Sequence, residues 1–424
     1  MTNARDRQRA PAAGDARLGG GMSRGLVLLL AATCGAAAAN LYYAQPLLHT
    51  LSGAFGISAG TAGLLITLSQ IGYVLGLALL VPLGDLRERR GLIAVALIVT
   101  ALGMAVAASA PTFVVFGSAI TIVGVTSVVA QIIVPMSSWM STEDERGRVV
   151  GTVMSGLLIG ILLARTVSGV IAGALGWRAV FFFATAVMLI FAITLRRALP
   201  RVPPTAELSY GGLLRSVLGL VRAEPVLRQR MVIGGLAFGC FSVLWTSLSF
   251  LLSGAPYHYG NAVIGLFGLA GVAGAVAASV VGRLADRGHG ARASMAAVLI
   301  MLASWGILAA GKTSLLALIV GIAVLDLGVQ GLHISNQSAI YGLAPEARSR
   351  LTTAYMVAYF LGGALLSALT SLLYASDGWG GVCVLGAITA GLALVVWTVS
   401  EMALRRRARD GRGRMIAMSG DLGG

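Results

Sequence analysis

The stretch that decides the fold reads VLDLGVQGLHISNQSAIYGLAPEARSR and runs from Val324 to Arg350. It begins inside an apolar segment long enough to cross a bilayer and ends in a short basic loop. Because lipid cannot satisfy polar groups, a polar stripe on a membrane helix must face protein or water. The spacing i, i+4, i+7 and i+11 puts four polar residues on one such face, which we expect to line a solute pathway: Asp326, Gln330, His333 and Gln337.

The composition is typical of an integral membrane protein. Of 424 residues, 57% are hydrophobic and only 11% are charged. Apolar runs of bilayer-spanning length recur along most of the chain. Three cysteines, Cys34, Cys240 and Cys383, lie within such runs and show neither paired-loop nor metal-ligand spacing. We expect them to be small core residues, without a disulfide framework.

The net charge of +15 is distributed unevenly along the chain. All but three of the 31 lysines and arginines lie in the two tails and in alternate loops; the exceptions are Arg165, Arg178 and Lys312. Basic residues accumulate in cytoplasmic loops, so this pattern places both termini in the cytoplasm and requires an even number of spans. The basic surface would meet anionic headgroups of the lipid bilayer. We expect no nucleic-acid partner, because no basic stretch is interleaved with aromatic residues.

Twelve spans are predicted, six on each side of a polar linker. The first half of the chain, residues 22–199, holds spans near 24–48, 59–82, 92–109, 112–137, 148–174 and 177–196. The second half, residues 230–403, holds spans near 230–253, 260–282, 293–310, 314–341, 351–374 and 379–402. Residues 1–21 are predicted to be a disordered cytoplasmic tail, and residues 404–424 a basic cytoplasmic tail.

The cytoplasmic linker, residues 200–229, contains a predicted interfacial helix. Its two arginines, Arg215 and Arg222, stand opposite an apolar face, which is typical of a helix lying on the membrane surface. That face is formed by Leu213, Val217, Leu220 and Val221.

The two halves share local sequence. ERGRVVGTVM, from Glu145, aligns with ARSRLTTAYM, from Ala347, at an offset of 202 residues. LGD, from Leu83, aligns with LAD, from Leu284, at an offset of 201. Two matches at nearly one offset indicate an internal duplication whose copies run in the same direction. The predicted fold is therefore an all-α membrane protein, with twelve transmembrane helices in two six-helix bundles related as parallel repeats.

Several segments carry a family resemblance. GRLADRGHGAR, from Gly282, and LGDLRERR, from Leu83, resemble the two copies of the signature between helices 2 and 3 of the major facilitator superfamily of transporters. In the first copy Val81 and Leu86 replace the usual glycine and arginine. NLYYAQPLL, from Asn40, and the region around Gly160 resemble a drug/proton antiporter-like subgroup that includes bacterial drug and nucleoside exporters. The resemblance implies transport by alternating access.

Two positions depart from that subgroup. Its members usually carry an arginine in helix 4, where Ile120 stands here, and a Gly-Pro pair in helix 5, where Gly160-Ile161 stands. Proton coupling through a helix 4 arginine is therefore not expected in this chain.

Asp326 and Arg165 are the two strongly charged residues expected deep within spans. At the offset of 202 they correspond to Gly124 and Ser367, so neither charge is part of the shared repeat. Burying a charge raises the free energy of the folded state by roughly several kcal/mol unless the charge is paired or hydrated. We hypothesise that the two residues couple transport to protons, with contact favouring the carboxylate and separation favouring the acid. The alternative is a structural ion pair.

A second set of residues is predicted to bind the substrate. Amides, hydroxyl groups and aromatic rings around one cavity suit a small, partly aromatic organic molecule. The alternative is that several of them only bridge neighbouring helices through hydrogen bonds. Ser242 and Ser249, which lie on the same helix face as Trp245, could also form such bridges. The set comprises Asn40, Tyr43, Gln70, Tyr73, Gln131, Trp245, Gln330, His333 and Gln337.

Two loops at the cytoplasmic face are predicted to act in gating. In the superfamily that this chain resembles, these loops form a charge clamp that holds one conformation of the two halves. An aspartate near the positive end of a neighbouring helix gives the clamp its physical basis. The alternative is surface salt bridging without a gating role. The predicted gating residues are Asp85, Arg89, Arg90, Asp286, Arg287 and Arg292.

The sequence thus predicts a secondary active transporter in the cell membrane, a proton-coupled antiporter that exports small organic molecules or drugs. A proton-coupled importer on the same fold is the alternative, and a sensor without transport is a third hypothesis. An enzyme is not expected, because the chain shows no phosphate-binding loop, paired catalytic carboxylates or nucleophile motif. We expect no cofactor and no metal, and a monomer that exchanges substrate and protons across the bilayer.

Overall fold

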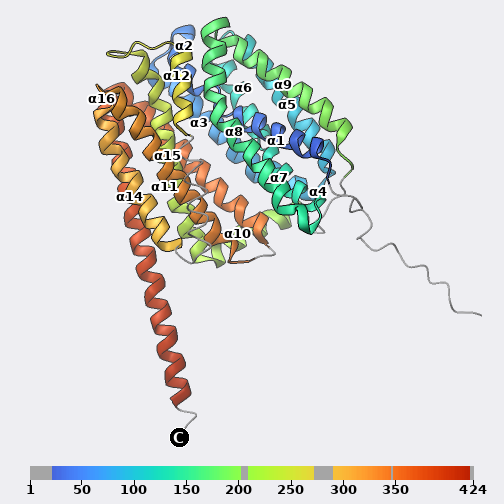
Figure 1. Ribbon diagram of the computed structural model, residues 1–424, viewed down its shortest axis with the longest axis vertical. Helices are drawn as coiled ribbons and strands as arrows, with labels where there is room; N and C mark the ends of the chain where they lie inside the picture. Colours follow the sequence, from blue (N-terminus) through green and yellow to red (C-terminus); the bar gives the residue numbers. More distant parts are fainter. Residues whose placement is uncertain (1–21, 202–208, 272–289, 345–346, 421–424) are drawn as a thin grey trace, which may run out of the picture.

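The computed structural model describes residues 22–201, 209–271, 290–344 and 347–420. Within these residues every regular element is a helix (Figure 1). The helices of the first half are α1 (Arg24–Ala39), α2 (Leu48–Phe55), α3 (Ala59–Leu75), α4 (Val81–Leu86), α5 (Arg89–Ser109), α6 (Phe113–Thr126), α7 (Val129–Met140), α8 (Glu143–Leu175) and α9 (Trp177–Ala198).

The linker and the second half are also helical in the described residues. They contain α10 (Tyr210–Ala223), α11 (Pro225–Ser253), α12 (Asn261–Leu266), a 3-10 turn (Phe267–Gly271), α14 (Gly290–Ala310), α15 (Leu315–Tyr341) and α16 (Arg348–Gly420). The last helix is interrupted at Gly378, where φ is 59°, a value that glycine adopts readily. The expected spans at 351–374 and 379–402 lie on either side of this interruption.

Nine helices in the described part of the chain are long and apolar enough to cross a membrane. One of them, Arg348–Ala403, contains two of the expected spans. Two further expected spans do not appear among these nine helices. The span at 260–282 extends beyond the described residues, and the span at 24–48 is divided between α1, a 3-10 turn and α2. The count of twelve and the division into two bundles of six stay predictions.

The first expected span is wrong in its end point. Helix α1 stops at Ala39, and the chain continues through a 3-10 turn (Gln45–Leu47) into α2. Pro46 explains the change, because it has no backbone N–H to donate within an α-helix. The flanking residues make tighter bonds instead: Gln45 N–H donates to Tyr42 O at 3.2 Å, and Leu47 N–H to Ala44 O at 3.1 Å.

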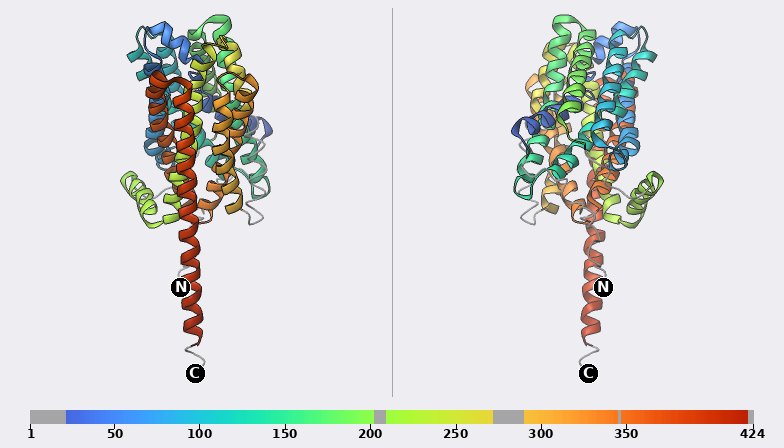
Figure 2. Two further views of the ribbon diagram at one scale, coloured as in Figure 1. Left: turned by 90° about the vertical axis from the view of Figure 1, so that its left-hand side faces the viewer. Right: turned by 90° about the vertical axis from the view of Figure 1, so that its right-hand side faces the viewer.

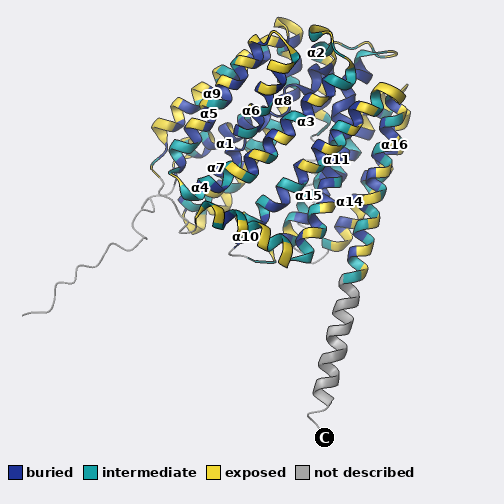
Figure 3. Ribbon diagram, turned by 180° about the vertical axis from the view of Figure 1, so that it is seen from behind, coloured by how far each residue is buried: buried dark blue, intermediate teal, exposed yellow. Residues whose placement is uncertain are grey.

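The outer surface is apolar where a membrane would surround it. Large hydrophobic side chains are exposed along α5, α9 and α16, and Figure 3 shows these exposed positions on the outward faces of the helices. Large apolar side chains exposed in such number would be unfavourable in water and are stable in lipid. Together with the candidate spans, it identifies an integral membrane protein. Examples are Val95, Leu102, Ile190, Leu365 and Ile388.

The sequence duplication reappears in how the helices pack. In the first half Gly35 of α1 faces α8, where an added Cβ would lie 2.5 Å from the carbonyl oxygen of Gly156. In the second half Gly235 of α11 faces α16, where a Cβ would lie 3.0 Å from the carbonyl oxygen of Ala358. Small residues allow membrane helices to approach closely. The same crossing therefore occurs twice, at offsets of 200 and 202 residues.

The two halves touch along two seams: α3 packs against α16, and α8 packs against α12. Figure 1 shows α2 and α12 near one end of the molecule, and two hydrogen bonds cross between the halves in this region. Thr50 Oγ1 donates to Asn261 Oδ1 at 2.8 Å, and the backbone N–H of His49 donates to Ser249 Oγ at 3.2 Å. Deeper in the molecule, Thr166 Oγ1 donates to Gly265 O at 3.0 Å.

The linker helix α10 lies at the opposite end, where α16 extends beyond the other helices (Figure 2). Its apolar face packs against α11 and α16, and Leu213 is buried. Tyr210 reaches the first half, because its hydroxyl donates to Leu79 O at 3.0 Å. A helix therefore forms where the sequence predicted one, and it packs against the rest of the protein; its position at the membrane surface stays a prediction.

Candidate functional site

The two buried charges predicted from the sequence lie on either side of the 3-10 turn Phe267–Gly271. Arg165 of α8 is 3% exposed and Asp326 of α15 is 5% exposed. An added Cβ would lie 2.9 Å from the Arg165 Cβ at Gly268, and 3.0 Å from Asp326 Oδ2 at Gly271. Glycine at these two positions leaves the room that the charged side chains occupy. The turn thus brings a cation of the first half and an acid of the second half to one region.

Arg165 is held by neutral neighbours. Its Nε donates to Gln45 Oε1 at 2.7 Å. Its guanidinium carbon lies 3.8 Å from the ring centroid of Trp245, 4.7 Å from that of Tyr42 and 5.3 Å from that of Phe241. Aromatic faces stabilise a desolvated cation through their quadrupoles. Gln45 and these rings therefore form a cage around the guanidinium group.

Asp326 and Arg165 interact electrostatically without forming an ion pair. The described residues contain three ion pairs, and all of them involve other side chains: Asp85–Arg89, Glu145–Arg148 and Arg230–Glu401. The last pair, at 3.5 Å, joins α11 to α16 and was not expected from the sequence. A direct contact between Arg165 and Asp326 is therefore not what holds either charge in this conformation.

Three buried polar atoms of this region have no hydrogen-bond partner among the described residues: Arg165 Nη2, Asp326 Oδ1 and Trp245 Nε1. The Trp245 indole N–H is directed toward the Asp326 carboxylate and acts on it as a hydrogen-bond donor, although the contact falls short of full hydrogen-bond geometry. Buried polar groups are nearly always paired, so a cluster of unpaired ones needs an explanation. Two donors and one acceptor together can bind a polar solute or water.

The polar stripe of α15 continues from Asp326 toward the linker end of the molecule. Gln330, His333 and Gln337 are all half-buried. His333 Nδ1 lies 3.1 Å from the hydroxyl of Tyr355, and its ring centroid lies 4.6 Å from that of Tyr359. The histidine is therefore fixed by α16, while the structure describes no hydrogen bond for the two glutamine side chains.

Aromatic rings connect the stripe to the arginine cage, and most of them were not predicted. Phe238 and Phe241 of α11 stack with centroids 5.4 Å apart, and Phe238 stacks on Tyr359 at 4.3 Å. Phe241 also lies 6.0 Å from Trp245. On α11 the three rings are spaced i, i+3 and i+7, a pattern that could have been recognised in the sequence. The result is a continuous aromatic surface from Arg165 to His333.

Two predicted residues bridge the halves. Gln70 of α3 donates from Nε2 to Ser242 Oγ at 3.0 Å, and its Oε1 has no described partner. The ring of Tyr73 lies 4.4 Å from that of Phe360, and its hydroxyl accepts a long bond of 3.5 Å from Gln131 Nε2. These residues border the same central region, although Gln70 and Ser242 also serve the bridging role considered as an alternative.

Asn40 and Tyr43 are directed differently from each other. Asn40 Nδ2 lies 3.4 Å from both Ser127 Oγ and Met188 Sδ, so this amide bridges α1 to helices of its own half. Tyr43 is buried, and its backbone oxygen accepts a bond of 2.6 Å from Ser168 Oγ. Neither side chain is described in contact with the arginine cage. Their neighbours Tyr42 and Gln45 occupy that place.

The predicted gating loop of the first half makes several described contacts within that half. Arg89 donates to Asp85 Oδ1 at 3.0 Å and to Gly84 O at 2.8 Å. Arg90 donates to Leu199 O at 3.1 Å, at the end of α9. Glu88 caps α5 by accepting from the backbone N–H groups of its first turn. The loop therefore joins α4, α5 and α9 at one end of the molecule.

The corresponding residues of the second half are only partly described. Asp286 and Arg287 lie outside the described residues, and Arg292 is exposed near the start of α14. The predicted charge clamp at the cytoplasmic face thus stays a prediction.

The family model of the Major Facilitator Superfamily matches residues 28–331 and 272–415. The putative uncharacterized transporter YgaY of Escherichia coli K12 is 47% identical over 378 residues, covering 89% of this chain and 95% of that protein. The probable transporter SCO4007 of Streptomyces coelicolor is 35% identical, with 90% and 88% covered. The crystal structure of the nucleoside transporter NupG has the same fold, with a TM-score of 0.71, 14% identity, and 88% and 98% covered. This chain is a membrane transporter that belongs to the major facilitator superfamily.

Proposed function

We propose that this transporter is a proton-coupled exporter of small organic molecules. In this proposal twelve spans form two bundles of six that move around a central site, with both termini in the cytoplasm. The observation that carries it is the placement of Arg165 and Asp326. One buried cation and one buried acid belong to different halves, lie in one region, are not ion-paired, and leave polar atoms unpartnered.

The proposed coupling rests on relative motion of the two charges. Arg165 is fixed to the first half through Gln45 and Tyr42 and to the second half through Trp245. When the halves rock, the cage changes and the distance to Asp326 changes with it. A nearer cation favours the carboxylate, and a more distant one favours the acid. Asp326 would therefore take up a proton in one conformation and release it in the other.

The proposed substrate is a small molecule with an aromatic part. The stacked rings of Phe238, Phe241 and Tyr359 offer flat apolar surfaces between the arginine cage and His333. The half-buried amides of Gln330 and Gln337 can donate and accept hydrogen bonds. Apolar faces with a few polar groups are what small-molecule sites in proteins usually present.

Transport in everted membrane vesicles tests this function. A panel of labelled aromatic solutes is added to vesicles with and without the protein, and a pH gradient is imposed that makes the vesicle lumen acidic. We expect uptake of at least one solute, and a protonophore should abolish it. The direction of the gradient distinguishes the two modes of coupling. Uptake driven by an acidic lumen assigns antiport, which exports solute from the cell, whereas uptake driven only by an acidic exterior assigns symport, which imports it. Binding of solutes without flux under either gradient would overturn the transporter mechanism in favour of a sensor.

A further inference from the structure

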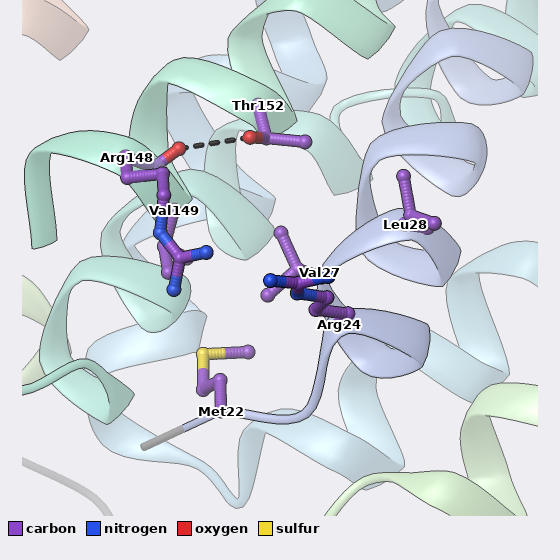
Figure 4. Close-up of a pocket in the computed structure, with 7 residues that line it drawn as sticks. All are labelled: Met22, Arg24, Val27, Leu28, Arg148, Val149 and Thr152. Carbon is purple, nitrogen blue, oxygen red and sulfur yellow. Dashed lines mark hydrogen bonds between the residues drawn. The ribbon is translucent and has the colours of Figure 1, made fainter. Parts of the chain in front are cut away.

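A crevice opens on the outer surface of the first half, where α1 and α8 begin (Figure 4). Its volume is about 160 Å³. Val27 and Val149, both buried, form its apolar floor, while Arg24 and Arg148 place their guanidinium groups at its mouth. Leu28 stands beside them and is 62% exposed. The crevice thus joins a basic mouth to an apolar, outward-facing side.

The matching crossing in the second half is covered. Gly35 in α1 corresponds to Gly235 in α11, because each allows close approach to the paired long helix. At the second crossing α10, which directly precedes α11, packs its apolar face against α11 and α16. In the first half the segment that precedes α1 is residues 1–21, which lie outside the described residues. No described helix takes the place of α10 there.

Charge decides between the possible occupants of the crevice. Arg148 donates to Glu145 Oε1 at 2.9 Å, but one carboxylate cannot neutralise both arginines, and Arg24 has no described acidic partner. Residues 1–21 carry four arginines and two aspartates, so the chain's own tail would add positive charge to a positive mouth. An anionic group complements the site better. Arginine binds phosphate with paired hydrogen bonds in a fixed geometry.

We propose that this crevice binds the headgroup phosphate of an anionic phospholipid in the cytoplasmic leaflet. The phosphate lies between Arg24 and Arg148, and an acyl chain follows Leu28 into the membrane. The volume admits several water molecules, and so a phosphate group, while the remainder of the lipid stays outside. Basic pockets between helices on the cytoplasmic side suit such headgroups. The choice of leaflet rests on the proposed orientation.

The bound lipid would add a charged link between the beginnings of two helices. They are joined here by Val27 and Val149, which pack in one apolar cluster, and by the hydroxyl of Ser141, just before α8, which lies 3.7 Å from Met22 Sδ. Below the crevice, α1 and α8 are held together by the contact between Gly35 and Gly156. At the mouth of the crevice the described polar contacts of α8 stay within that helix: the Thr152 hydroxyl donates to Arg148 O, and Arg148 donates to Glu145 Oε1, both at 2.9 Å. A phosphate shared by two arginines adds an interhelical link at the membrane surface.

Lipid binding to the purified full-length protein tests the proposal. The protein in a neutral detergent is titrated with phosphatidylglycerol, with phosphatidylcholine, or with inorganic phosphate, and its melting temperature is followed. We expect stabilisation by phosphatidylglycerol alone. Affinity should fall about fivefold for each of Arg24→Gln and Arg148→Gln, the typical contribution of one arginine at an anionic surface. Glu145→Gln should raise it, because Arg148 loses its competing partner. Arg146→Gln, an exposed neighbour outside the crevice, is the matched control.

Equal stabilisation by the neutral lipid, or an unchanged affinity in the Arg24→Gln/Arg148→Gln double variant, would overturn the site. Stabilisation by inorganic phosphate alone would replace the lipid by a free anion. A photo-crosslinking amino acid at Leu28 gives an independent readout in native membranes. We expect its adducts to be enriched in anionic lipid relative to those from Val95, an exposed position on α5. Adducts to residues 1–21 would instead assign the crevice to the tail.

Discussion

At the scale of single residues, the cage around Arg165 determines how the central site can work. Each aromatic face contributes about 0.5–2 kcal/mol to a desolvated cation. A buried carboxylate paired directly with Arg165 would also stabilise it, but that carboxylate would then be neutralised. Because Gln45 and three rings hold the guanidinium group, Asp326 keeps an unpartnered oxygen. The acid therefore stays available to a proton or a solute.

The cage predicts a stability cost for losing Gln45. Gln45→Ala removes the acceptor of Arg165 Nε and leaves a buried donor unsatisfied. A hydrogen bond to a charged group contributes roughly 1.5–3 kcal/mol, so the variant should melt at a lower temperature in detergent. Gln337→Ala, which removes a half-buried amide on α15, is the control and should melt like the wild type. Equal melting temperatures for Gln45→Ala and the control would mean that the rings alone hold the arginine.

Asp326→Asn tests proton coupling directly. Asparagine preserves the shape and can still form hydrogen bonds, but it cannot titrate. The variant should exchange a transported solute across proteoliposomes at a rate near that of the wild type, while pH-gradient-driven accumulation is lost. The measurement is counterflow and gradient-driven flux in the same preparation. Undiminished accumulation with the same pH dependence would leave Asp326 with a structural role.

The two charged residues could be predicted from the sequence because charge inside an apolar span stands out. Their neighbours could not, because Gln45 and Tyr42 lie in a segment predicted to be a regular helix. The break after Ala39 turns that segment, so Asn40 bridges helices of its own half while Gln45 reaches Arg165. The rings on α11, such as Phe241, follow a helical spacing that could have been recognised in the sequence. That spacing alone does not mark a site, since rings are common on the lipid-facing and core sides of any span.

At the scale of helices, glycine contacts fix how α1 meets α8. An added methyl group on Gly35 would lie 2.5 Å from the Gly156 carbonyl oxygen, which cannot move without displacing α8. Gly35→Ala should therefore destabilise the folded protein by about 1–3 kcal/mol, the usual cost of overpacking. Gly151→Ala on α8 has open space within 4 Å and should be neutral or slightly stabilising, since alanine favours helix. The melting temperatures of both variants are measured in the same detergent. Similar melting temperatures for Gly35→Ala and Gly151→Ala would contradict the close approach of α1 to α8.

The loop between α4 and α5 gives a second test at this scale. Asp85→Asn removes the ion pair with Arg89, which as a partly exposed contact adds no more than about 1 kcal/mol to stability. If the loop acts in gating, transport should slow several-fold while the amount of inserted protein is unchanged, because the balance between conformations shifts. Glu145→Gln removes a similar surface pair elsewhere and should transport normally. A normal transport rate in a well-expressed Asp85→Asn protein would mean that this ion pair has no role in gating.

Helix positions were predictable to the extent that hydropathy marks them. The spans of α5, α9 and α14 agree closely with expectation, because each is bounded by turn residues or charges. The interruption at Gly378 was expected as a loop between spans, and the structure makes it with one glycine at positive φ. The close approach of α1 to α8 was not predicted, since glycines that face a neighbouring helix cannot be distinguished in sequence from those that face lipid.

At the scale of the whole molecule, the proposed orientation predicts which surfaces a membrane-impermeant thiol reagent reaches. Gly53→Cys and Ala255→Cys, both exposed near the end that carries α2, should be labelled from outside intact cells. Arg215→Cys on α10 should be labelled only after the membrane is opened. The native cysteines are all buried, so the unmodified protein is a suitable blank. Labelling of Arg215→Cys in intact cells would show that the proposed orientation is wrong and that α10 lies outside the cell.

The asymmetry of the central charges also bears on how a duplicated carrier can diverge. The repeat counterpart of Asp326 is Gly124, which packs so tightly against the backbone of α3 at Ser69 that no side chain fits. The counterpart of Arg165 is Ser367, whose hydroxyl is engaged with that of Thr246 at 2.8 Å. Two copies of the first half would carry cations without an acid, and two copies of the second half an acid without a cation. Under the proposed coupling, which needs both charges, two identical halves could not form this site, and neither half could substitute for its twin.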